Sequence, residues 1–198
     1  MDQTASADYD IIGIEKGELI SMDIDLGLSQ PSDLPRIYSI MEEAFPPAET
    51  ISYKVFERLY HNPKYKVLAI KNKLGMLSGF LSWWKLDGFN FAEYFAIRKN
   101  MRGRGLGSVV LNKFLRRTKK PVVLEVEAFD TNTAKRRIKF YQRLGFKLND
   151  ITYIQPPLNK SNEQIPLTIM SYPELIPQAK RQSVIDQIFT NVYKKVPA

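Results

Sequence analysis

The chain has 198 residues, 44% of them hydrophobic, a length and composition that suit one domain around a single sizeable core. It contains no cysteine, which excludes disulfide bonds, a cysteine nucleophile and a cysteine metal cluster. The formal net charge is +8, so nucleic acid has to be considered as a partner.

The N-terminal 21 residues differ in character from the rest of the chain. They carry five acids against one lysine, and they lack the basic start and apolar core of a signal peptide. We predict that residues 1–21 form a loose leader, with Met22 as an alternative start. No apolar run approaches the length that spans a bilayer, so we expect a cytoplasmic protein without a membrane partner.

Hydrophobic periodicity predicts the elements of the first half of the chain. Alternation of polar and apolar residues indicates strands, and apolar residues three or four positions apart indicate helices. Pro46-Pro47 and Asn62-Pro63 end the two helical patterns, and Asp87-Gly88 marks a hairpin turn. The predicted order is a strand at 22–28, helices at 33–45 and 51–60, and strands at 65–70, 76–84 and 90–97.

The second half continues as a mixed α/β pattern. It predicts a helix at 106–117, a buried strand at 122–126, a helix at 133–144 that closes at Gly145, and strands at 146–154 and 165–170. Beyond them, an amphipathic helix from about 177 to 194 has one apolar face. We expect that face to pack on its own domain, and a partner subunit is the alternative. The apolar face of this helix consists of Val184, Ile185, Ile188, Phe189 and Val192.

A glycine-rich turn between the strand at 90–97 and the next helix is the strongest candidate ligand site. Glycines leave the main chain open to a ligand, and the helix N-terminus adds amide donors and partial positive charge, so a pyrophosphate is the expected guest. No Lys-Ser or Lys-Thr pair follows a glycine as a P-loop requires. A dinucleotide fingerprint would need a third glycine where Ser108 stands, although Glu125 lies near the distance of a ribose contact.

Two motifs together resemble the GNAT superfamily of N-acetyltransferases. Arg102, Gly105 and Gly107 match Arg-x-x-Gly-x-Gly of its acyl-CoA loop, and the segment from Tyr141 to Phe146 is similar to its Tyr-x-x-x-Gly-Phe signature. The resemblance covers about residues 22–170. One departure is Ala134, which stands where family members often carry asparagine.

The resemblance implies the fold and the domain limits. We expect a single GNAT-like α/β domain at 22–172, with a mixed central sheet of about six to seven strands whose central pair is splayed to admit the cofactor. Residues 173–198 would form a C-terminal helical extension that carries the amphipathic helix.

The resemblance also implies which residues bind acetyl-CoA, the expected acyl donor. The cofactor-binding set combines backbone that pairs with pantetheine and the loop that holds the pyrophosphate, namely Phe95, Ala96, Ile97, Arg102, Gly103, Arg104, Gly105, Leu106, Gly107 and Ser108. Fifteen Lys or Arg but only three acids fall between Arg98 and Lys147, where such an anionic ligand needs cations.

Two catalytic residues are predicted for attack of a neutral amine on the thioester. Glu93, an acid in an apolar strand, is the candidate base, and an outward-facing position on a half-exposed strand is the alternative. Tyr141 matches the family tyrosine that protonates the leaving thiolate, and a plain core role is its alternative. No metal site is expected, because His61, the only histidine, is predicted to end the second helix.

The predicted function is therefore transfer of an acetyl group from acetyl-CoA to a small-molecule or peptide amine by direct attack in a ternary complex. A nucleotide-binding oxidoreductase half-domain, a basic nucleic-acid-binding module and a catalytically silent CoA-binding regulator are the alternatives. Nucleic acid is disfavoured, because aromatic residues do not interleave with the basic run. The acceptor is not recognisable from the sequence, and a homodimer stays open.

Overall fold

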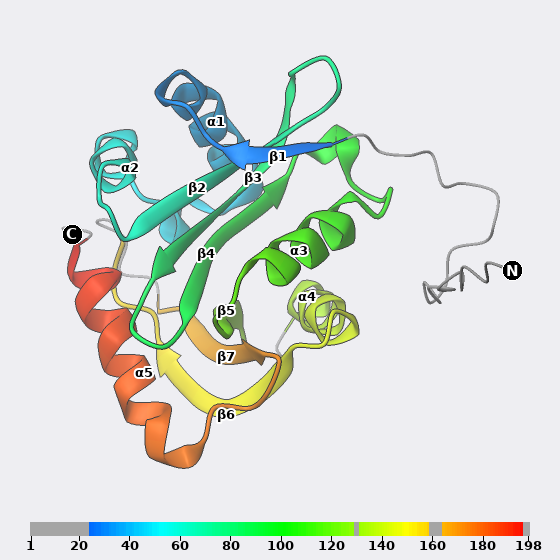
Figure 1. Cartoon of the computed structure of the whole chain (residues 1–198). Coiled ribbons are helices and arrows are strands. Elements are labelled where there is room, and N and C mark those ends of the chain that lie inside the picture. Colours follow the sequence, from blue (N-terminus) through cyan, green and yellow to red (C-terminus); the bar gives the residue numbers. More distant parts are fainter. Residues whose placement is uncertain (1–23, 129–130, 159–163, 196–198) are drawn as a thin grey trace, which may run out of the picture.

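The computed structural model describes residues 24–128, 131–158 and 164–195 (Figure 1). The expected leader at 1–21 and the expected strand start at Met22 lie outside these ranges. Within them, no helix combines the length and apolar character needed to cross a membrane.

A seven-stranded mixed sheet forms the centre of the molecule, in the order β1-β2-β3-β4-β5-β7-β6. Neighbouring strands are antiparallel except at β4 and β5, which run parallel. The predicted single α/β domain with a mixed sheet is thus confirmed. The strands are β1 (Asp25–Leu28), β2 (Tyr65–Lys71), β3 (Leu77–Lys85), β4 (Asn90–Ile97), β5 (Val122–Glu127), β6 (Lys147–Ile154) and β7 (Pro166–Tyr172).

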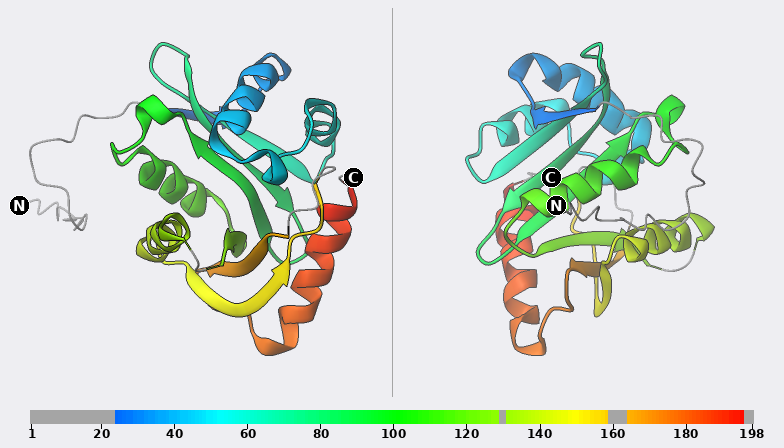
Figure 2. Two further views of the ribbon diagram at one scale, coloured as in Figure 1. Left: turned by 180° about the vertical axis from the view of Figure 1, so that it is seen from behind. Right: turned by 45° about the vertical axis from the view of Figure 1, so that its right-hand side comes forward.

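Five α-helices cover the two faces of the sheet (Figure 2). One face, here called the α1 face, packs against α1, α2 and α5, and the opposite face, the α3 face, packs against α3 and α4. Each side therefore has its own apolar core. The helices are α1 (Leu34–Ala44), α2 (Tyr53–Tyr60), α3 (Leu106–Arg117), α4 (Asn132–Arg143) and α5 (Gln178–Asn191).

Local chemistry explains where the helices start and stop. Thr131 caps α4, because its Oγ1 accepts a hydrogen bond from the amide of Ala134 at 3.0 Å. Gly145 follows that helix with φ +91°, a left-handed conformation that glycine adopts without steric cost. His61 stands at the C-cap of α2, as predicted.

The C-terminal helix packs on its own domain rather than leaving its apolar face open. Val184, Ile188 and Val192 are buried in the core of the α1 face, and Ile188 has no exposed surface. Phe189 packs edge-on against the rings of Tyr153 and Tyr193, at 5.3 and 5.5 Å between centroids. The C-terminal segment is consequently joined to the sheet at the side where β6 ends.

The sheet opens between its two parallel strands. β4 and β5 are paired at only three positions, Asn90 with Val122, Phe91 with Val123 and Ala92 with Leu124. β4 then stays with β3, whereas β5 stays with β7. Glu93 and Glu125 are thus the first residues past the last pair on the two strands.

A β-bulge lies at the same place. Ser82 of β3 pairs with Tyr94 and Trp83 pairs with Ala92, so Glu93 has no partner on β3. The amide of Tyr94 instead donates a hydrogen bond to Ser82 Oγ at 3.3 Å. Because of the extra residue, Phe91 and Tyr94 both face the α1 side of the sheet.

Candidate active site

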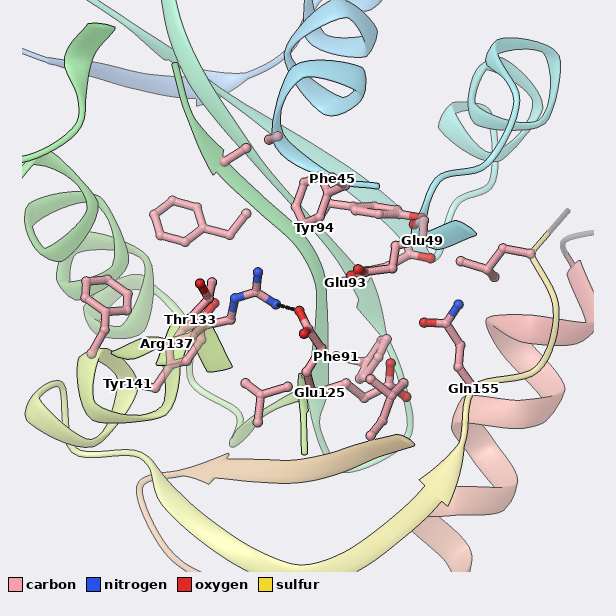
Figure 3. A pocket seen from close by; sticks show the side chains of 18 of the residues that line it. Phe45, Glu49, Phe91, Glu93, Tyr94, Glu125, Thr133, Arg137, Tyr141 and Gln155 are labelled. Carbon is pink, nitrogen blue, oxygen red and sulfur yellow. Dashed lines mark hydrogen bonds and ion pairs between the residues drawn. The ribbon is translucent and has the colours of Figure 1, made fainter. Parts of the chain in front are cut away.

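A cavity of about 440 Å³ occupies the place where β4 and β5 separate (Figure 3). Its wall combines residues of both strands with residues of α4, of the loop between α1 and α2, and of the C-terminal segment. Arg137, Thr133 and Tyr141 stand at one end in Figure 3, Glu49 and Gln155 stand at the other, and Glu93 lies between them.

Glu93 lies in this cavity wall and not on an outward-facing position. Its Oε2 accepts a hydrogen bond from Trp84 Nε1 at 3.0 Å, and Trp84 has no exposed surface. Burial raises the pKa of Glu93 to about 8, and the hydrogen bond from Trp84 offsets only part of that rise. A carboxyl group with a pKa near neutrality can exchange a proton with a bound amine.

Glu125 is a second carboxyl group in the same wall, on β5. Its Oε2 accepts a hydrogen bond from the Tyr193 hydroxyl at 2.7 Å, and its Oε1 accepts one from the Tyr153 hydroxyl. Burial raises the pKa of Glu125 to about 7, against the two hydrogen bonds, which lower it. The sequence suggested Glu125 only as a ribose contact, and the parallel pairing limited to β4 and β5 gives no support to a dinucleotide fold.

Tyr141 lines the cavity from α4. Its ring packs edge-on against Phe140 and Phe146, at 5.2 and 5.5 Å between centroids, and its hydroxyl has no hydrogen-bond partner in the described part of the chain. Burial raises the pKa of Tyr141 to about 12, although the nearby Arg137 opposes the rise. The hydroxyl therefore stays protonated at neutral pH and has a proton to donate.

An ion pair ties α4 to the sheet beside this residue. Arg137 Nη1 lies 2.8 Å from Glu127 Oε1 at the end of β5, and both side chains line the cavity (Figure 3). Glu127 lies beyond the last residue pair of β4 and β5. The ion pair therefore fastens α4 to the part of β5 that has separated from β4.

The glycine loop borders a second cavity of about 410 Å³. Gly103 and Gly105 have φ of +79° and +74°, and a Cβ built on either would meet nothing within 4 Å, so their backbone is open to a ligand. Arg102 Nε donates to the carbonyl of Ile97 at 2.7 Å, which fixes the start of the loop to the end of β4. Of the predicted loop residues, Arg104 lines neither of the two cavities.

The two cavities are adjacent, because Phe95, Ile97, Arg102 and Phe140 line both. Ala96 lines the first. The cofactor set predicted from the sequence, except for Arg104, thus borders two adjacent cavities, one at the glycine loop and one at Glu93 and Tyr141.

Sequence reasoning did not identify three parts of the cavity wall. Glu49 lines it, and its carbonyl accepts a hydrogen bond from the Tyr94 hydroxyl at 3.0 Å. Gln155 and Tyr193 enter from the end of β6 and the C-terminal segment, and no motif marks either. Trp83 and Trp84 face opposite sides of the sheet, and neither lines the cavity.

Within the described ranges, no group of three or more acidic or histidine side chains is placed to hold a metal ion. The lining residues of both cavities offer carboxyl, hydroxyl and backbone groups for chemistry, with arginines near the loop.

Comparison with known proteins relates this arrangement to acetyltransferases. A family model described as "Acetyltransferase (GNAT) family" matches residues 34–146. The chain is 43% identical over 70 residues to "Putative acetyltransferase YjbC" of Bacillus subtilis (strain 168), a match that covers 34% of this chain and 35% of that protein.

Solved structures agree on the fold. A structure titled "Putative acetyltransferase from GNAT family" from Bacteroides thetaiotaomicron has a TM-score of 0.78 and 28% identity, covering 85% of this chain and 98% of its own. A variant of spermidine N-acetyltransferase SpeG from Vibrio cholerae has a TM-score of 0.61 at 14% identity, covering 82% and 97%. The ribosomal-protein-S18-alanine N-acetyltransferase of Escherichia coli has a TM-score of 0.58 at 20% identity, covering 78% and 96%. The family model matches more than half of the chain's length, so the chain belongs to the GNAT family of acetyltransferases.

Proposed function

We propose that this protein transfers an acetyl group from acetyl-CoA to an amine by direct attack in a ternary complex. The observation that carries the proposal is the placement of Glu93 and Tyr141 in the wall of one cavity that adjoins the cavity of the glycine loop. A base for the amine and an acid for the leaving thiolate would thus meet at the inner end of a site for an elongated anionic donor.

The donor would lie along the strand opening. Its pyrophosphate would face the amides of the glycine loop and of the first turn of α3, where the helix N-terminus favours negative charge. Glu93 to Ile97 of β4 have no strand partner on the β5 side, so backbone groups on that edge are placed to pair with pantetheine. They would also stabilise the oxyanion that forms at the thioester carbonyl.

The chemical step needs one proton removed and one supplied. Glu93 would accept the proton of the attacking amine, the nitrogen would form a bond to the acetyl carbon, and the bond from carbon to sulfur would break. Tyr141 would protonate the thiolate, because its raised pKa keeps the phenol in the acid form. Proton release to solvent and uptake by the tyrosine would then restore both groups.

The related structures support an amine as the acceptor, since two of them are named for N-acetylation of spermidine and of a ribosomal protein alanine. The test is a thiol-release assay with acetyl-CoA against aliphatic amines and peptide N-termini, together with thermal melting. We expect thiol release that depends on the amine. Acetyl-CoA at 100 times its Kd should stabilise the fold by about 2.7 kcal/mol, whereas NAD and short DNA should not. Protection by NAD or DNA alone would contradict the proposal.

A further inference from the structure

Two carboxyl groups line the cavity from the two strands at the point where the sheet opens. The last paired residues of β4 and β5 are Ala92 and Leu124, so Glu93 and Glu125 hold equivalent positions one residue further along. Phe91 and Val123, two residues earlier, both belong to the core of the α1 face, which places the two glutamates on that same face. Glu125 is close enough to add to the raised pKa of Glu93, after the larger effect of burial.

Glu125 is fixed in its place by two elements distant in the sequence. Tyr153 comes from β6 and Tyr193 from the 3-10 turn that follows α5 (Tyr193–Lys195), and each hydroxyl donates to a different oxygen of the carboxyl group. Two hydroxyl donors suit an ionised carboxylate, which accepts through both oxygens. The two hydroxyl groups therefore favour the negatively charged form of Glu125, and one of them, that of Tyr193, comes from the C-terminal segment.

The charges around this position are unbalanced. The cations that line the cavity are Arg102, Arg136 and Arg137, which come from the glycine loop and from α4 on the α3 face. Of the carboxyl groups that β4 and β5 supply to the wall, Glu127 is paired with Arg137, whereas the described partners of Glu93 and Glu125 are neutral side chains.

We propose that Glu125 binds a second ammonium group of the acceptor, so that the substrate class is aliphatic amines with two cationic nitrogens. This inference rests on the proposed acetyl transfer. Glu93 takes the proton of the reacting amine, and Glu125 remains the counter-ion of the other nitrogen. Two carboxylates close together in a partly buried cavity are costly unless cations neutralise both, and an acceptor with one nitrogen leaves one of them uncompensated.

The test compares diamines from 1,3-diaminopropane to 1,6-diaminohexane with the monoamine of the same chain length, in the wild type and in Glu125→Gln. For the wild type, we expect a higher kcat/KM with the best diamine than with its monoamine. Glu125→Gln should lower kcat/KM for that diamine by roughly 10- to 100-fold, the scale of a lost hydrogen bond to a charged group, mainly through KM. The monoamine should be affected less than about threefold.

Two further variants separate this role from a structural one. Tyr193→Phe should give a smaller loss, again selective for the diamine, because Tyr153 still holds Glu125. Glu57→Gln, which removes an exposed carboxyl group on α2, should leave both substrates unchanged. Glutamine keeps the size of the side chain and one acceptor oxygen, while its amide NH2 can donate to the second tyrosine hydroxyl. Thermal melting establishes that Glu125→Gln folds.

The outcomes distinguish this inference from the acetyl transfer on which it rests. Equal losses for diamine and monoamine in Glu125→Gln, or a wild type that prefers monoamines or a peptide N-terminus, overturns the role of Glu125 and leaves acetyl transfer standing. Absence of thiol release with every amine and peptide overturns the proposed function itself.

Discussion

At the scale of single residues, the surroundings of Glu93 oppose its charge. The carboxyl group lies in the cavity wall with one hydrogen bond from Trp84, and Glu125 adds a like charge nearby. A base is most effective when its pKa lies near the working pH, so the environment that destabilises the ionised form also makes Glu93 suitable for proton transfer. The same environment has a consequence for stability.

Glu93→Gln should make the stability of the fold less dependent on pH. The pKa of Glu93 rises from 4.5 in the unfolded chain to about 8 in the fold. Its contribution is therefore fully present below pH 4.5 and is lost as the pH rises toward 8. We expect the difference in melting temperature between Glu93→Gln and the wild type to move in favour of the variant from pH 5 to pH 8. Melting curves without ligand measure this, and parallel pH profiles would refute it.

Tyr141→Phe should lower turnover by about 10²- to 10⁴-fold if the hydroxyl protonates the thiolate, with the smaller value expected because CoA is a fair leaving group. The ring contacts with Phe140 and Phe146 remain, and the hydroxyl has no described partner to lose. The melting temperature and the affinity for CoA should therefore change little. Full turnover with a lowered melting temperature would instead assign Tyr141 to the core.

At the scale of elements, the glycine loop and α3 form one anion site. Gly105 is the N-cap of α3 in the left-handed conformation, so a side chain there would strain the turn as well as obstruct a ligand. Gly107 differs, because its φ is ordinary and a Cβ would meet Phe140 at 3.6 Å, a normal contact. Gly107 is consequently the better position for testing the loop without disturbing the fold.

Gly107→Glu should weaken CoA binding by roughly 100-fold or more, since a carboxylate beside the pyrophosphate costs several kcal/mol. Gly107→Gln, with the same size and no charge, is the matched control and should lose less. Calorimetry measures both, and added salt should reduce the gap between them. An unchanged affinity in a folded Gly107→Glu variant would remove the loop from the site.

At the scale of the whole molecule, the charge is divided between the two sides of the sheet. The excess of lysine and arginine falls in the stretch that forms α3 and α4. The acids Glu49, Glu93 and Glu125, which line the cavity, lie on the α1 face. Such a division suits an anionic donor on one side and a cationic acceptor on the other.

Much of the fold could be predicted from the sequence, because its elements depend on local periodicity and on turn residues. The helix after the glycine loop and the strand before it have the predicted limits, and β1 begins at Asp25 within the predicted strand. The site could be predicted only in part. Glu93 and Tyr141 stand in recognisable motifs, but the partnership of Glu125 with Tyr193 depends on strand register and on packing 68 residues away.

The bulge at Glu93 restricts where an acid on β4 can act. The extra residue shifts the alternation of side chains along β4. Phe91 faces α1 before it, and Tyr94 and Ala96 face α1 after it. A glutamate moved to position 92 or 95 would therefore face α3, on the wrong side of the sheet. Deleting Glu93 would restore simple alternation, and the later side chains of the strand would keep their present faces. Because of the extra residue, β4 offers two neighbouring positions on the α1 face, so Glu93 faces the cavity while Tyr94 keeps its place in the core.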